Sequence, residues 1–124
     1  MPRTNAFLMR ASEKYLSVNV LPGDLEVEAG LARINKILGA KEYDTSPNGK
    51  FAVFSAGRMI SYVRELGNVD IRIECRPSSD DPTHAGIVLA GRHDANARDR
   101  LTRTMARAMA TFFRKNPDSI YPVR

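Results

Sequence analysis

Two short polar segments of this chain carry the residue types needed to bind an anion or to transfer a proton. The first contains Arg10 and Ser12 and continues into Ser17 and Asn19. An arginine with nearby hydroxyl and amide groups suits a phosphate or a carboxylate. The alternative is a solvated strand face with local turn hydrogen bonds, which is common on half-buried strands.

The second segment contains His84, which follows Asp80 and Asp81 and precedes an apolar run. A carboxylate that orients the imidazole ring would allow this histidine to act as an acid–base group. The sequence ties no nucleophile to it, so we favour a turn with local hydrogen bonding of His84. For an enzyme, the catalytic candidates are His84 and Ser12. The ligand-binding candidates are Arg10, Ser12, Ser17, Asn19 and His84.

A third signal is a set of arginines near the C-terminal end, in a stretch with helical periodicity. At 100° per residue they fall within about 60° of each other, opposite the apolar stripe. They are Arg100, Arg103, Arg107 and Arg114. Such a face would meet phosphates and bind them in a salt-dependent way. An acidic protein surface would suit this face as well as phosphates do. The alternative is a hydrated helix face that has no partner. No aromatic residue lies between these arginines, which argues against the binding of single-stranded nucleic acid.

Strong catalytic and metal-binding motifs are absent from the sequence. Two histidines and one cysteine are too few for a zinc site. There is no glycine-rich phosphate loop, dinucleotide fingerprint, nucleophile elbow or calcium loop. We therefore expect no cofactor and no metal, and we favour a protein that is not an enzyme.

The elements that must position these residues follow from hydrophobic periodicity and from turn signals. We expect strands at residues 15–21, 51–54, 69–76 and 85–89, and helices at residues 25–38, 58–66 and 95–115. This order predicts an α+β fold with a small mixed sheet of about four strands and three helices. We expect one domain over residues 1–124, with a loose arm at 1–9 and an irregular tail at 116–124.

Local signals refine several of these elements. Asp24 and Asp94 are expected to cap the first and last helices, and Gly39 to follow the end of the first. Leu66 should lie on the apolar side of the middle helix. Cys75 belongs to an alternating strand and is expected to be a buried, inert thiol.

Composition is that of an ordinary globular protein with a basic balance. Of 124 residues, 43% are hydrophobic and 27% charged, and the net charge is +5. One cysteine rules out an internal disulfide and suits a reducing compartment. Neither a secretory signal nor an apolar run long enough for a bilayer is visible, so we expect a cytoplasmic protein without a membrane partner. Five methionines and an apolar tail would permit a homodimer.

Several short segments, taken in order, resemble those of a group of small bacterial proteins to which we attach no activity. They are Arg10-Ala-Ser12, Leu16-Ser-Val-Asn19, Phe51 to Gly57, Pro82-Thr-His-Ala85 and Val88 to Gly91. The likeness covers about residues 7–91. It implies no activity for this chain, but it implies that the segment of Arg10 and Ser12 lies near that of His84.

Three hypotheses follow. The leading one is an accessory or binding protein of a bacterial cytoplasm that presents a basic surface to a protein or an anionic partner. The second is a small enzyme, or a sensor of a phosphorylated ligand, that uses Arg10, Ser12 and His84. The third is a nucleic-acid-binding protein that uses the arginines of the last helix.

Overall fold

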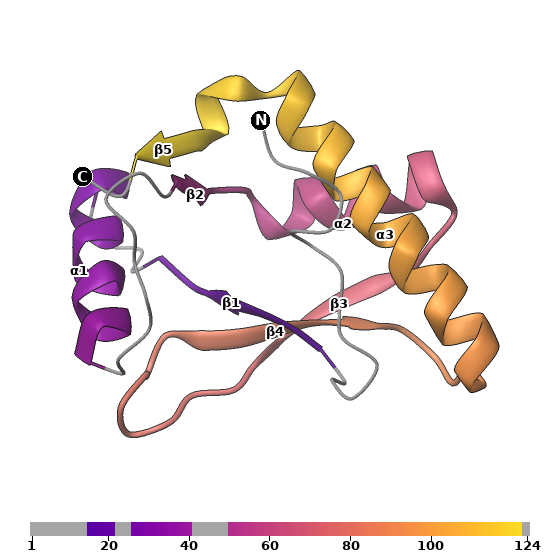
Figure 1. Cartoon of the computed structure of the whole chain (residues 1–124), viewed down its shortest axis with the longest axis horizontal. Helices are drawn as coiled ribbons and strands as arrows, with labels where there is room; N and C mark the ends of the chain where they lie inside the picture. Colours follow the sequence, from indigo (N-terminus) through magenta and orange to yellow (C-terminus); the bar gives the residue numbers. More distant parts are fainter. Residues whose placement is uncertain (1–14, 22–25, 41–49, 123–124) are drawn as a thin grey trace.

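The computed structural model describes residues 15–21, 26–40 and 50–122. Within these ranges the chain forms three α-helices, one 3-10 helix and five short strands (Figure 1). They are β1 (Leu16–Asn19), α1 (Val27–Ala40), β2 (Lys50–Ala52), α2 (Ala56–Gly67), β3 (Ile71–Cys75), β4 (His84–Leu89), α3 (Ala95–Lys115), η2 (Pro117–Ser119) and β5 (Ile120–Pro122). The predicted α+β class and the three predicted helices are confirmed.

The described strands form two antiparallel sheets, where we expected one mixed sheet. The larger sheet has the order β1-β4-β3, and β4 pairs with both neighbours through Ile87, which lies opposite Leu16 on one side and Ile73 on the other. The short strand β2 pairs instead with β5. The tail after α3 was expected to be irregular. It forms η2 and β5 because its apolar residues supply β2 with a partner strand.

The core lies between the inner face of the larger sheet and the helices α2 and α3. Strand alternation turns Ile71 and Ile87 toward the helices, and they are 4% and 0% exposed. From the helices, Met59, Met105 and Phe113 are completely buried against them. Fully burying one such side chain contributes about 1.5–3 kcal/mol. This packing fixes the outer faces of the sheet and of α3, where the candidate site residues lie.

The boundaries of α3 agree with those predicted, and Asp94 caps it as expected. Its Oδ1 accepts a hydrogen bond of 2.8 Å from the backbone amide of Ala97. The helix α2 begins at Ala56, two residues earlier than predicted, and ends at Gly67. Asn68 follows in the left-handed conformation, with φ of 55°.

Helix α1 has 14 residues, as many as predicted, but it ends two residues later and includes Gly39, which we had placed just beyond its end. The backbone stays helical through Ala40, so no left-handed cap is needed at the glycine. The predicted apolar stripe is confirmed in its centre, where Leu31 and Ile34 are buried, while Val27 in the first turn is 36% exposed. The expected cap Asp24 and the expected arm at residues 1–9 lie outside the described residues.

Two burial predictions are wrong. Cys75 is exposed because it is the last residue of β3, which is an edge strand of its sheet. Leu66 is 53% exposed because it lies in the last turn of α2, beyond the fully buried Val63. Each residue fits the periodicity of the buried positions in its strand or helix. Each also lies at the end of that element, where the core no longer covers it.

Candidate functional site

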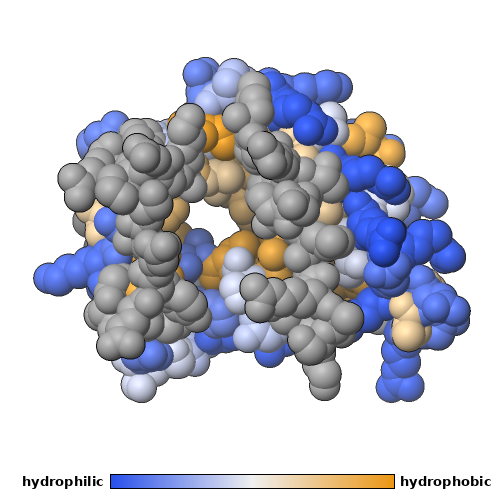
Figure 2. Space-filling model, in the orientation of Figure 1, coloured by the Kyte–Doolittle hydropathy of each residue, from blue (hydrophilic) through white to orange (hydrophobic). Residues whose placement is uncertain are grey.

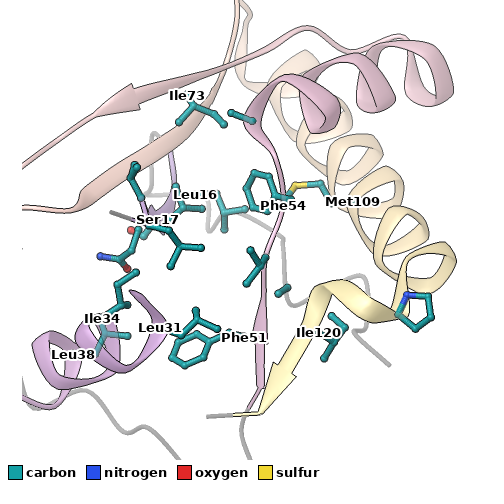
Figure 3. A pocket seen from close by; sticks show the side chains of 18 residues that line it. Leu16, Ser17, Leu31, Ile34, Leu38, Phe51, Phe54, Ile73, Met109 and Ile120 are labelled. Carbon is teal, nitrogen blue, oxygen red and sulfur yellow. The ribbon is translucent and has the colours of Figure 1, made fainter. Parts of the chain in front are cut away.

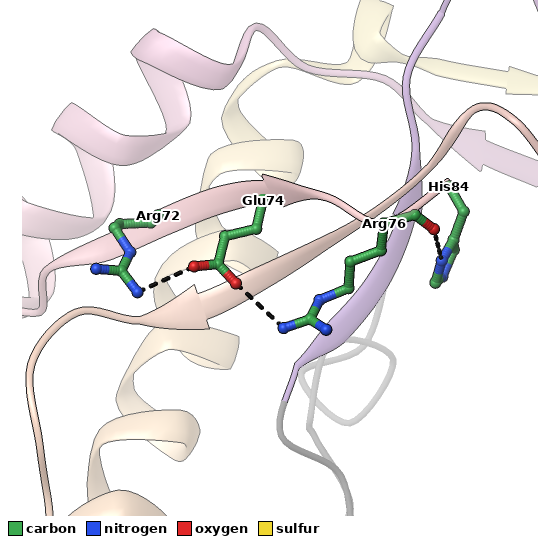
Figure 4. A network of polar contacts seen from close by, with 4 residues as sticks. All are labelled: Arg72, Glu74, Arg76 and His84. Carbon is green, nitrogen blue, oxygen red and sulfur yellow. Dashed lines mark hydrogen bonds and ion pairs between the residues drawn. The ribbon is translucent and has the colours of Figure 1, made fainter. Parts of the chain in front are cut away.

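His84 opens strand β4 and contacts two other elements of the outer sheet face. Its Nδ1 lies 3.0 Å from the backbone oxygen of Arg76, and its Nε2 lies 3.3 Å from the Oγ of Ser17 (Figure 4 shows the first contact). A carbonyl oxygen can only accept a hydrogen bond. In the neutral ring Nδ1 therefore carries the proton and donates a hydrogen bond to the backbone carbonyl of Arg76. Nε2 then accepts a hydrogen bond from the Ser17 hydroxyl.

The His84 ring is therefore oriented by a backbone carbonyl, and not by the carboxylate that the acid–base hypothesis required. Asp81 is instead bound to Asn19, whose Nδ2 donates to both carboxylate oxygens at 3.0 and 3.2 Å and lies 3.0 Å from the Oγ1 of Thr83. That hydroxyl lies 3.1 Å from Asp81 Oδ1. Asp81 is only 1% exposed. Its carboxylate thus anchors the loop between β3 and β4 to strand β1.

Tyr15 covers the centre of this face and connects His84 to Arg76. Its ring centroid lies 4.2 Å from the guanidinium carbon of Arg76 and 5.8 Å from the centroid of the His84 ring. The ring rests on Gly86, where an added Cβ would lie 2.7 Å from Tyr15 Cδ2. A glycine inside a strand often marks such a close approach. The sequence reasoning missed Tyr15, Arg76 and Gly86, although Tyr15 and Ser17 share the parity of this face.

Three charged side chains, from β3 and the residue that follows it, form a row on the same face of the sheet. Glu74 accepts from Arg72 at 3.0 Å and from Arg76 at 3.1 Å, one carboxylate oxygen for each guanidinium (Figure 4). These ion pairs are partly exposed, so each stabilises the fold by no more than about 1 kcal/mol. The glutamate balances part of the positive charge of the two arginines, which weakens this end of the sheet as a site for an anion.

Of the ligand-binding candidates, the structure brings Ser17 and Asn19 of β1 next to His84 of β4. Asn19 lies opposite His84 in the strand register, and its amide is occupied by Asp81. Arg10 and Ser12 lie outside the described residues, so their approach to His84 stays a prediction. Around His84, the structure shows a serine–histidine contact that is open to solvent on the Ser17 side.

The four arginines predicted on one helix face are all exposed along the outer side of α3, and we call this set the arginine face. Hydrophilic surface follows the course of α3 in Figure 2. The Nε of Arg103 pairs with Asp99 at 3.2 Å. The guanidiniums of Arg107 and Arg114 instead donate to the hydroxyls of Thr104 and Thr111, which lie three residues earlier. The arginine face consists of Arg100, Arg103, Arg107 and Arg114.

The whole positive excess of the chain resides in this helix. Helix α3 contains six Lys or Arg residues and one Asp. The chain has 19 basic and 14 acidic residues, so outside α3 the charges balance at 13 of each. A net charge of +5 is therefore concentrated on one element about 30 Å long.

A cavity of about 1110 Å³ lies between α1, β1, β2 and α3 (Figure 3). Most of its lining is apolar and comes from residues such as Leu16, Ile34, Phe51 and Met109. Figure 2 shows an opening in this face of the molecule with hydrophobic residues in its wall. The sequence reasoning did not foresee this space. Its lining suits an apolar molecule and not a charged one.

No metal site emerges from the described residues, among which no three His, Cys, Asp or Glu side chains form a group that could hold an ion. Among the same residues, no helix has the length and apolar character needed to cross a bilayer. Compared with protein-family models, curated proteins and solved structures, the chain matches none of them.

Proposed function

We propose that this chain is a binding protein that holds a polyanionic partner against the arginine face of α3. The observation that carries the proposal is the charge distribution, with the whole excess of +5 on α3 and balanced charge elsewhere. A charge excess spread over the surface would serve solubility, whereas one confined to a single helix, with four of its six cations on one face, creates a local field that attracts anions. Arginine also binds planar oxyanions through paired N–H donors.

The hydrogen bonds of the arginine face support the same proposal. A hydrated helix surface commonly carries charges of both signs, which pair three or four residues apart. Here only Arg103 pairs with a carboxylate among the contacts described for this face. Arg107 and Arg114 contact neutral hydroxyls, so their positive charge is not compensated by their own helix.

Retention on a heparin column tests this proposal, because heparin is a polyanion of no particular sequence. The test variant is Arg107→Gln/Arg114→Gln, and the matched control is Arg64→Gln/Arg72→Gln. Both lose two exposed arginines, so their net charge is equal. We expect the test variant to elute at clearly lower salt than the control. Equal elution of the two variants would show that only net charge matters and would overturn the proposal.

A second candidate function is acid–base catalysis, which the contact between Ser17 and His84 favours. A hydroxyl, a base and a group that orients the base are the parts of an activated nucleophile, and they are present here as Ser17, His84 and the carbonyl of Arg76. Hydrolysis of an activated ester tests it. Ser17→Ala and His84→Ala should each lower the rate at least tenfold, and unchanged rates would leave the contact a structural one.

A further inference from the structure

We infer that the polyanion is double-stranded nucleic acid, bound through its phosphate backbone without readout of base sequence. This inference rests on the proposed function. The inference depends on three properties of the arginine face: its straight seven-residue repeat, the threonines between its arginines, and the absence of large apolar and aromatic side chains around it.

The repeat places cations in a line. Arg100, Arg107 and Arg114 are seven residues apart, which is about 10.5 Å along the axis, with a drift of only about 20° per step. The row from Arg100 to Arg114 is therefore about 21 Å long. Side chains spread over this length cannot converge on one small phosphorylated molecule. They match an extended array of phosphates, such as the backbone of a duplex, which offers one charge per about 1.7 Å of its axis.

Threonines with the same seven-residue spacing hold this row in place. The Thr104 hydroxyl donates to the Arg100 carbonyl at 3.1 Å and accepts from Arg107 at 3.5 Å. The Thr111 hydroxyl donates to the Arg107 carbonyl at 2.9 Å and accepts from Arg114 at 3.2 Å. Each contact uses one of the five N–H donors of a guanidinium. The side chains of Arg107 and Arg114 are thus held along the helix, and each keeps N–H donors for a phosphate.

The composition of the exposed arc separates nucleic acid from an acidic protein and a duplex from a single strand. Within about 60° on either side of Arg100, the outer arc of α3 carries no aromatic or large apolar side chain, and Ala97 is its one apolar residue. The other residues of the arc are Asn96, Arg100, Arg103, Thr104, Arg107, Thr111, Arg114 and Lys115. A protein interface has an apolar or aromatic centre, and single strands stack on exposed aromatic rings. The aromatic residues of α3, Phe112 and Phe113, are buried at 3% and 0% exposure.

Fluorescence anisotropy with 20-base-pair DNA duplexes of two unrelated sequences tests the inference. We expect equal affinity for the two, because phosphate contacts carry no sequence information. With four contacts, the logarithm of Kd should rise with the logarithm of salt concentration with a slope of about 3.6. Arg107→Gln/Arg114→Gln should weaken binding roughly 50-fold at 0.1 M salt and halve the slope. Arg64→Gln/Arg72→Gln should leave the slope unchanged.

Further probes distinguish the failure of the inference from the failure of the proposed function. Retention on heparin without binding to either duplex would overturn the inference and leave the proposed function standing. Tighter binding to a 20-nucleotide single strand, or to poly-glutamate, than to the duplex would overturn it in favour of those partners. A duplex RNA of the same sequence identifies the source of the backbone, and binding to it with a similar salt slope supports phosphate contacts. If the unsubstituted protein binds neither heparin nor the duplex, both proposals are overturned.

Discussion

The side-chain amide of Asn19 donates to both carboxylate oxygens of Asp81, which lies 62 residues further along the chain. Because Asp81 is 1% exposed, its charge has little water to solvate it and depends on such donors. The pair ties the loop after β3 to the end of β1. It therefore helps to fix the register that brings Ser17 and His84 together.

Asn19→Ala should destabilise the fold by about 2 kcal/mol, because it leaves a buried carboxylate without an important donor. Urea denaturation gives this free energy. Ser17→Ala is the control on the same strand and face, and it should change stability by no more than about 0.5 kcal/mol, since Ser17 is exposed. Equal effects of the two substitutions would show that the amide contributes nothing specific.

Gly86→Ala should destabilise the fold by about 1–3 kcal/mol through overpacking. The new methyl group would lie within 3.0 Å of Cβ, Cγ and Cδ2 of Tyr15, so turning the ring alone cannot relieve the clash. Thermal unfolding followed by circular dichroism measures the effect. In a Tyr15→Ala background the same substitution should cost much less. A cost that is independent of Tyr15 would contradict the contact between them.

Asn68→Ala should destabilise the fold by about 1 kcal/mol, because Asn68 has φ of 55° and alanine tolerates this region less well than asparagine. Asn68→Gly should be neutral or stabilising, since glycine adopts the left-handed region without steric cost. Chemical denaturation of both variants checks the order. The prediction is wrong if alanine proves as stable as glycine at this position.

The thiol of Cys75 should react with a thiol reagent in the folded protein at a rate within about tenfold of that in urea, because the side chain is exposed. The chain has only this cysteine, so the colour released by a disulfide reagent reports on it directly. A reaction several hundredfold slower in the folded state than in urea would contradict this prediction and would agree with the buried thiol that the strand pattern predicts.

The sequence predicts best those features that are local and periodic. Helix α3, its cap Asp94 and the arginine face follow from a 3.6-residue period over 21 residues, and the structure places all of them as expected. Strands β3 and β4 follow from alternation and from a short apolar run. Such patterns report which side of an element is apolar, and this is decided by neighbours within a few residues.

The features that could not be predicted depend on partners distant in sequence. Strands β2 and β5 have three residues each, too few for a pattern that would select one another. The Asn19–Asp81 pair and the Tyr15–Gly86 contact also join residues more than 60 positions apart. The exposure of Cys75 depends on where its strand ends within the sheet, and alternation alone does not contain that information.

Concentrating the charge on α3 has a kinetic consequence. A body with balanced charge and one positive flank is an electric dipole, so the field of a polyanion exerts a torque on it before the two surfaces touch. In the proposed encounter with a polyanion the molecule would then arrive with α3 foremost, which would remove much of the orientational search that slows neutral encounters to about 10⁵–10⁶ M⁻¹s⁻¹. Added salt shortens the range of this torque, to about 10 Å at 0.1 M. Capture should therefore slow with salt even where the final complex still forms.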